Sequence, residues 1–315
     1  MRFDRAVADL GSLCRVDEPL GPLTTYRVGG KAAIFVAPVS AAELHDVATV
    51  VARYALPVLV VGRGSNLLVA DRGFDGVAIS LAGLTDHVDI DGADVHAGSA
   101  VALPVLARKT AAAGLTGFEW AVGVPGSIGG AVRMNAGGHG SDIAACLVSA
   151  DIYDLHAVSS SSRPAATLGL RFRGSALADH EVVLAAHLKL AHGDIERSER
   201  EIAEIVRWRR DNQPGGQNAG SVFVNPIPGE LSAGELIDRI GLRGYRIGGA
   251  FVSEKHANFI QAGEGATAAD VKAVIDDVRD RVARETGFEL RSEVRLVGFD
   301  GGGLRAAQPE GSTRG

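Results

Sequence analysis

The segment GVPGSIGGAVRMNAGGHG, residues 123–140, constrains the fold more than any other part of this chain. It holds seven glycines in eighteen residues. A polar linker would be featureless, but here Val124, Ile128, Val132 and Met134 are interleaved with the glycines. Because glycine lets the backbone come close to a bound molecule, the pattern predicts backbone wrapped around a flat, partly apolar ligand.

Two further glycine corners precede this segment, TYRVGG at 25–30 and VVGRGSNLLV at 60–69. Successive amides in such a loop can cradle phosphate oxygens. A Rossmann fingerprint would need a third glycine at position 67 and then a helix, but Leu67 and a strand-and-turn pattern follow. The Rossmann fold is therefore excluded. For residues 60–69 taken alone, a phosphate loop and a plain turn both remain open.

Apolar periodicity predicts alternating strands and helices. Residues 32–38 and 58–61 are typical of buried strands, and Ser40 with Glu43 forms a capping box that begins the helix between them, which Pro57 ends. The same signals predict more helices over residues 103–113, 194–210, 232–241 and 267–287. Residues 145–192 indicate mostly β structure, and residues 289–299 indicate a final strand.

Composition excludes several classes of protein. The 315 residues are 46% hydrophobic and 22% charged, as in globular proteins, and exceed the roughly 250–300 residues at which single cores stop growing. A net charge of −6 without a basic run predicts no nucleic-acid partner. With no apolar run near the roughly 18 residues of a membrane span, we expect no membrane partner and a cytoplasmic location. Cys14 and Cys146 are too few for a disulfide framework or a zinc site, and no metal is expected.

Six motifs follow one another in an order that characterises one enzyme family. They are GRGSN (62–66), GVPGSIGGAVRMNAG (123–137), FRGS (172–175), AGSVFVNP (219–226), GYRIGGAFVSEKHANFI (244–260) and SEVRLVGF (292–299). Each is weak alone, but together they cover nearly the whole chain from about residue 20. The chain thus resembles the UDP-N-acetylenolpyruvoylglucosamine reductases. The short stretch between Arg173 and Ser221 is similar to their shorter subtype, which lacks an inserted substrate-closing loop.

The resemblance implies an α+β fold, with a two-lobed FAD-binding region of the vanillyl-alcohol-oxidase type and a separate α/β substrate-binding domain. We expect the first lobe at 1–82, the second at 83–192, the substrate-binding domain at 193–299 and a disordered tail at 300–315. The implied reaction reduces UDP-N-acetylglucosamine enolpyruvate to UDP-N-acetylmuramate in peptidoglycan precursor synthesis. It uses non-covalent FAD and NADPH as co-substrate. Oligomeric state stays open. An oxidase of the same flavin fold and a non-catalytic flavin-binding protein are the alternatives.

The resemblance also implies which residues contact the cofactor. Both glycine segments contribute, through Gly62, Gly64, Ser65, Asn66, Gly123, Pro125, Gly126, Ser127 and Gly130. Arg63 departs from the family pattern, because that position often carries another glycine.

Hydride addition to an α,β-unsaturated carboxylate builds negative charge, so the site needs a cation or acid and a proton donor. The resemblance assigns Arg173 and Glu293 to stabilising the charge and Ser221 to donating the proton. From the residues alone, Arg173 would lie on the solvent face of a strand. Glu293 would lie in the final strand, between Arg291 and Arg295, in a surface ion-pair row.

Ser221 has two other interpretations. A nucleophile elbow has the pattern G-x-S-x-G, but Ala219 and Phe223 occupy the glycine positions, which excludes it. A turn serine is the default for a serine between a glycine and an apolar run. Only the resemblance makes Ser221 a proton donor. The ionisation state of Glu293 stays open.

Substrate contacts are implied at Asn225, His256 and Asn258, although a buried structural role for His256 is equally well supported. Four basic residues are candidates for binding the UDP diphosphate, or are simply solvated: Arg210, Arg243, Arg246 and Lys255.

Overall fold

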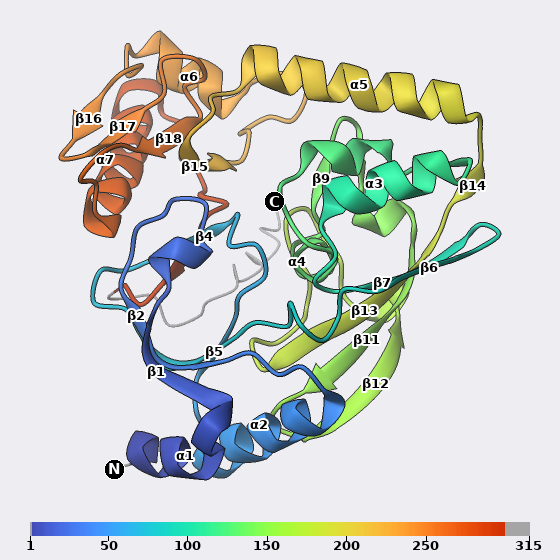
Figure 1. The fold of residues 1–315 in the computed structure, drawn as a ribbon. Coiled ribbons are helices and arrows are strands. Elements are labelled where there is room, and N and C mark those ends of the chain that lie inside the picture. The colour runs from blue at the N-terminus through green and yellow to red at the C-terminus, as the bar shows by residue number, and fades with distance from the viewer. Residues whose placement is uncertain (1, 300–315) are drawn as a thin grey trace, which may run out of the picture.

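The computed structural model describes residues 2–299, whose three larger sheets lie around a common centre (Figure 1). The first sheet has the strand order β1-β2-β5-β3 and is packed against α1 and α2. Its elements are α1 (Arg2–Leu10), β1 (Cys14–Pro19), β2 (Lys31–Val36), α2 (Ala41–Tyr54), β3 (Val58–Val60) and β5 (Phe74–Ile79).

The predicted βαβ unit is confirmed, because β2 and β3 both run parallel to β5, which lies between them. Ser40 begins α2 as expected, its Oγ accepting a hydrogen bond from Glu43 N at 3.2 Å. The carboxylate of Glu43 returns to the backbone of Val39 rather than to that of Ser40. The capping arrangement is therefore reciprocal but displaced by one residue.

The second sheet is antiparallel, with the order β12-β11-β13-β7-β6. Its strands are β6 (Val88–Asp91), β7 (Asp94–Gly98), β11 (Leu147–Asp154), β12 (Ser159–Pro164) and β13 (Glu181–Lys189). The helices α3 (Leu103–Ala112) and α4 (Ile128–Met134) share its core. The β structure predicted for 145–192 is confirmed, apart from an irregular loop over 165–180.

The third sheet has the order β15-β18-β17-β16 and is covered by α6 and α7. Its elements are β15 (Gln217–Ser221), α6 (Ala233–Arg239), β16 (Arg246–Ile247), β17 (Ala250–Val252), β18 (Phe259–Ala262) and α7 (Ala268–Thr286). Thr267 and Asp270 form the predicted capping box of α7, and Gly287 ends that helix with φ +77°. The valines at 271, 274, 278 and 282 recur at helical spacing, and all four are buried.

The helix α5 (Ile195–Asn212) crosses from the second sheet to the third (Figure 1). Its buried residues Ile202 and Ile205 belong to the core of the second lobe, with Leu106 of α3. The packing therefore favours a domain boundary after α5 rather than at residue 193. The division into three domains stays a prediction.

The final strand is shorter than predicted: only β19 (Arg295–Val297) is a strand, and it pairs in parallel with β4 (Leu67–Val69) of the first lobe. Residues before it make single backbone bonds to the loop after β15, such as Val224 N to Arg291 O at 2.9 Å, instead of a ladder. Glu293 is consequently not in a strand. The C-terminal segment thus ties the third sheet to the first lobe.

Short strands complete the described chain: β8 (Leu115–Thr116) with β14 (Ala191–His192), and β9 (Gly137–Gly138) with β10 (Ser141–Asp142). The tail predicted to be disordered, 300–315, lies outside the described residues. Across residues 2–299, no helix combines the length and apolar character needed to span a membrane.

Candidate active site

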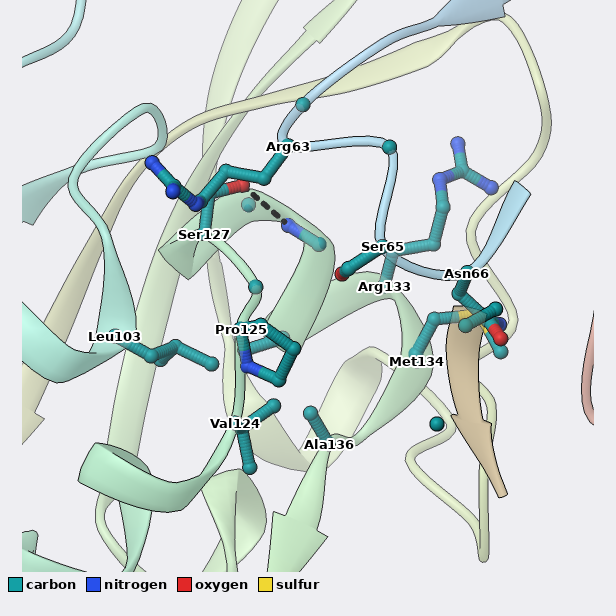
Figure 2. Close-up of a pocket in the computed structure, with 18 of the residues that line it drawn as sticks. Arg63, Ser65, Asn66, Leu103, Val124, Pro125, Ser127, Arg133, Met134 and Ala136 are labelled. Carbon is teal, nitrogen blue, oxygen red and sulfur yellow. Dashed lines mark hydrogen bonds between the residues drawn. The ribbon is translucent and has the colours of Figure 1, made fainter. Parts of the chain in front are cut away.

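A cavity of about 990 Å³ lies where the three sheets meet. This volume is at the upper end of the roughly 300–1,000 Å³ of ordinary ligand pockets. The cavity is lined by all nine glycine-segment residues expected to contact the cofactor, and also by Arg173, Ser221, Glu293 and Asn225. His256 and Asn258 are not among its lining residues. Figure 2 shows the glycine-rich part of this lining.

All five residues of the loop Gly62–Asn66 line the cavity. Within the described part of the chain, none of its five N–H groups donates a hydrogen bond, although Gly64 O and Asn66 O both accept. Consecutive free amides of this kind bind anions. The row therefore fits the diphosphate of a dinucleotide such as FAD, and a phosphate loop explains this segment better than a plain turn.

Two glycines in this loop are required by their surroundings. A Cβ on Gly62 would lie 2.8 Å from Ser127 Oγ, so this glycine brings the two glycine segments together. Gly64 has φ +60°, and a Cβ there would lie 2.1 Å from Leu23 O. Any larger residue at 64 would displace the loop and its row of amides.

The segment 123–140 is used differently along its length. Ser127 begins α4, its Oγ accepting from Gly130 N, and Val124 and Pro125 line the cavity (Figure 2). Ile128 and Val132, by contrast, are fully buried in the core of the second lobe. Of the four interleaved apolar residues only Val124 and Met134 line the cavity, because α4 turns its other face inward.

Arg173 is not on a strand, contrary to the expectation from its neighbours. It lies in a two-residue turn closed by reciprocal backbone bonds between Arg171 and Gly174, at 2.9 and 3.0 Å. Arg173 has φ +56°, a left-handed conformation that non-glycine residues rarely adopt. Phe172, at the same turn, is 60% exposed. A strained residue at a cavity is consistent with a functional role.

The turn is held firmly from behind by α4. Ser175 Oγ donates to Arg133 O at 2.7 Å, and the guanidinium of Arg133 donates to the carbonyls of Leu177 and Ala178 in the following loop and of Glu181 at the start of β13. The guanidinium of Arg173 itself donates to Gly137 O at 2.9 Å. These contacts fix a backbone conformation that would otherwise relax.

Glu293 faces Arg173, with Oε2 at 2.9 Å from Nε. The pair is bent, since this N–H of Arg173 makes no hydrogen bond to any described residue. Burial raises the pKa of Glu293, and this effect outweighs the positive charges of Arg173 and Arg291, which lower it. A carboxyl group with a raised pKa is better able to act as a hydrogen-bond donor.

Ser221 ends β15, after Gly220, which has φ +79°. The pairing of β15 with β18 is irregular between Asn218 and Ser221, and this bulge turns the chain toward the cavity. The hydroxyl of Ser221 makes no hydrogen bond within residues 2–299 and is therefore available to a ligand. Glu293 N donates to Val222 O at 2.8 Å, which places the two segments side by side.

Asn258 and His256 support this loop rather than line the cavity. Asn258 is buried, its Oδ1 accepting from Phe223 N at 2.9 Å and its Nδ2 donating to Phe223 O at 2.8 Å. His256 packs against the Phe259 ring. Both polar groups of Asn258 are thus already used, which argues against the expected substrate contact. Asn225 does line the cavity, with Oδ1 accepting from Ala233 N.

None of the four basic residues considered for the UDP diphosphate lines the cavity. Arg243, for example, is paired with Asp238, and Lys255 donates to Arg210 O. Sequence reasoning missed instead Arg209 of α5 and Gln213, the residue that follows this helix, and both line the cavity. Helical spacing is the sequence feature that could have indicated Arg209, because this residue lies one turn after Ile205 on the inward face of the helix.

The arginines that line the cavity differ in their partners. Arg173 is paired with Glu293, and Arg133 and Arg295 share Asp179. Burial lowers the pKa of Arg133 to about 10, so its guanidinium remains charged at neutral pH. Two other lining arginines, Arg63 and Arg209, make no ion pair with any residue that the structure describes.

Comparisons with known proteins agree with this architecture. A family model described as the C-terminal domain of UDP-N-acetylenolpyruvoylglucosamine reductase matches residues 212–297, and an FAD binding domain model matches residues 32–156. The reductase of Heliobacterium modesticaldum is 43% identical over 94% of each chain, and that of Bacillus subtilis is 38% identical over 90% of this chain and 93% of the relative.

A solved structure is also similar. The crystal structure of UDP-N-acetylenolpyruvylglucosamine reductase from Thermus caldophilus superposes with a TM-score of 0.78 at 35% identity, covering 90% of this chain and 99% of that one. Sequence and fold therefore agree over almost the entire length. The chain belongs to the UDP-N-acetylenolpyruvoylglucosamine reductases, which are FAD-dependent oxidoreductases that use NADPH.

Proposed function

We propose that this cavity reduces the enolpyruvyl group of UDP-N-acetylglucosamine enolpyruvate, and that Arg173, Glu293 and Ser221 carry the chemistry. The observation that carries this proposal is the meeting of these three side chains on one cavity, from segments far apart in the chain. When bound, FAD supplies hydride transfer from NADPH to the substrate. The residues of the chain then have to bind the carboxylate, stabilise its growing charge and deliver one proton.

Arg173 is suited to the carboxylate. Its guanidinium is permanently charged and planar, so it can bind a carboxylate through two parallel hydrogen bonds. Its Nε lies beside Glu293 and its Nη1 donates to Gly137 O, so Nη2, which makes no hydrogen bond to a described residue, is the donor left for a ligand. As hydride reaches the β-carbon, negative charge moves onto this carboxylate, and the arginine stabilises that charge.

Glu293 is the second group that would stabilise the negative charge of the substrate. Burial raises the pKa of Glu293, which favours the protonated carboxyl group. In that form it would donate a hydrogen bond to the enolate. Ionised, it would instead repel that enolate. The protonated form is therefore the one that serves the reaction.

Ser221 delivers the proton to the α-carbon. An alcohol is a weak acid, but a carbon enolate is a strong enough base to accept its proton. Its hydroxyl is free of hydrogen bonds to the described residues and lies on the segment that Glu293 N fixes through Val222 O. The proton at the α-carbon and the hydride at the β-carbon together complete the reduction of the double bond.

The first test is the state of the cofactor. Purified protein should be yellow, and denaturation should release free FAD, because the backbone amides of the glycine loop would hold the cofactor without a covalent bond. Colour that stays with the precipitated chain would contradict non-covalent binding.

The second test separates the reductase from an oxidase of the same fold. In stopped-flow experiments NADPH should reduce the flavin, and the enolpyruvyl substrate should then reoxidise it faster than oxygen does. Oxygen as the sole effective oxidant would favour the oxidase.

A further inference from the structure

The loop Gly62–Asn66 carries one charged side chain, Arg63, and that side chain is uncommitted. Arg63 is exposed, lines the cavity and makes no ion pair or hydrogen bond within residues 2–299. Asn66, at the other end of the loop, is engaged, its Nδ2 donating to Glu293 O at 2.9 Å. One end of the loop is therefore bonded to the segment of Glu293, and the other end carries the guanidinium of Arg63, which has no partner among residues 2–299.

Position 63 is the place in this part of the loop where a long side chain fits. A Cβ on Gly62 would meet Ser127 Oγ, and a Cβ on Gly64 would meet Leu23 O. Arg63 has no positive φ, so an arginine is accommodated there without backbone strain. Figure 2 shows its side chain extending from the loop toward Ser127 of the second lobe.

Arg63 differs from the other arginines that line the cavity in its surroundings. Three lining arginines lie beside carboxyl groups. The other one without an ion pair to a described residue, Arg209, belongs to α5 and lies near His139, whose pKa is lowered by burial and further by the charge of Arg209. Arg63 lies instead in the row of free amides itself. Five N–H donors and a guanidinium on one short loop suit a group with two negative charges and several oxygens, which is a diphosphate.

We propose that Arg63 forms an ion pair with the diphosphate of bound FAD and adds a salt-dependent contribution to cofactor affinity. The amide row supplies the directional hydrogen bonds, and Arg63 supplies the net charge that amides lack. FAD is favoured over the nucleotide sugar because Arg63 faces the second lobe rather than the third sheet that carries Ser221. This inference rests on FAD binding in the cavity, which is part of the proposed function.

The test is a titration of FAD into apo-protein from which the cofactor has been removed, followed by flavin fluorescence. The variants are Arg63→Gln and the charge-conserving Arg63→Lys, with Arg108→Gln as the control. Arg108 is an exposed arginine on α3 that bonds only its own helix, at Pro104 O, and does not line the cavity.

At about 20 mM salt, Arg63→Gln should weaken FAD binding about 2- to 5-fold, as expected for an exposed ion pair. At about 500 mM salt the Debye length falls to a few ångströms, and the difference from wild type should nearly vanish. Arg63→Lys should recover most of the affinity, and Arg108→Gln should match wild type at both concentrations.

Equal FAD affinity of Arg63→Gln and wild type at low salt would overturn the inference. So would an unchanged FAD affinity accompanied by a raised KM for the nucleotide sugar, because the cation would then serve the substrate. A wild-type apo-protein that binds no FAD at all would instead contradict the cofactor assignment itself, so the two failures are distinguishable.

Discussion

Arg173 Nε lies 2.9 Å from Glu293 Oε2, and this contact joins a strained turn of the second lobe to a C-terminal segment that also holds the loop of Ser221. The pair brings a permanent cation and a carboxyl of raised pKa to one point of the cavity. An enolate that forms there meets a positive charge and an acid together. The consequences of this arrangement can be measured residue by residue.

Replacing Ser221 with alanine should leave flavin reduction by NADPH nearly unchanged, because no proton is delivered to carbon in that half-reaction. Oxidation of the reduced enzyme by substrate should slow about 10²- to 10⁴-fold, the usual contribution of general acid catalysis. Substrate affinity should change little. Single-turnover oxidation measures this directly, and Ser221→Cys, with its more acidic proton, should keep more activity than alanine. A wild-type rate in Ser221→Ala would make Ser221 a turn serine.

The pH dependence of the same half-reaction should report Glu293. Since the protonated carboxyl serves the reaction, the wild-type rate should fall as the pH rises through the raised pKa of Glu293. Glu293→Gln keeps a hydrogen-bond donor that does not titrate. Its rate should be lower, because an amide is a weaker donor than a carboxylic acid, but flat over this range. An identical descending limb in the variant would assign that limb to another group.

Glu293 should also make stability depend on pH. Its folded-state pKa is raised, so between the ordinary value and the raised value the folded chain binds more protons than the unfolded chain. Stability therefore falls as the pH rises through this window. Denaturant unfolding of wild type and Glu293→Gln from acid to neutral pH should show wild type losing stability relative to the variant as the pH rises. The opposite slope would mean that the Arg173 charge outweighs burial.

Asn258 should be a positioning residue for the loop of Ser221. Asn258→Ala leaves the buried N–H and carbonyl of Phe223 without side-chain partners, at a cost of about 2–4 kcal/mol in stability. The oxidative half-reaction should slow, while FAD affinity stays unchanged. Asn212→Ala is the matched control, since Asn212 is exposed and bonds only Trp208 O. If the two variants have the same stability and the same rate of the oxidative half-reaction, Asn258 does not position the loop of Ser221.

Gly64→Ala should abolish most FAD binding, whereas Gly92→Ala should not. Both glycines have a left-handed backbone, with φ +60° and +58°, so both variants incur a similar strain of about 1 kcal/mol. A Cβ at 64 would lie 2.1 Å from Leu23 O, but nothing lies within 4 Å of a Cβ at 92. The difference in FAD affinity between the two variants therefore isolates the displacement of the amide row. Equal affinities would mean that the loop adapts.

Much of the fold was predictable because the signals are local. The caps at Ser40 and Thr267 act within three residues, and the valine spacing of α7 repeats within one turn, so the chain carries this information in short windows. Glycine corners are local too, since φ at Gly64 depends on the absence of a side chain. The candidate catalytic residues were identified in another way, because six motifs follow one another in the order that the reductase family shows.

The sequence by itself determined the helices, the glycine loops and the family, but not the environments of the functional side chains. Arg173 occurs in an alternating pattern typical of a strand, yet α4 holds it in a strained turn, and Glu293 leaves its expected strand to meet it. Asn258 is buried and binds the backbone of Phe223, and α5 packs in the core of the second lobe. In both cases the covering segments are remote in sequence. Burial and ion pairing depend on which distant segments surround a group, and only the tertiary structure decides that.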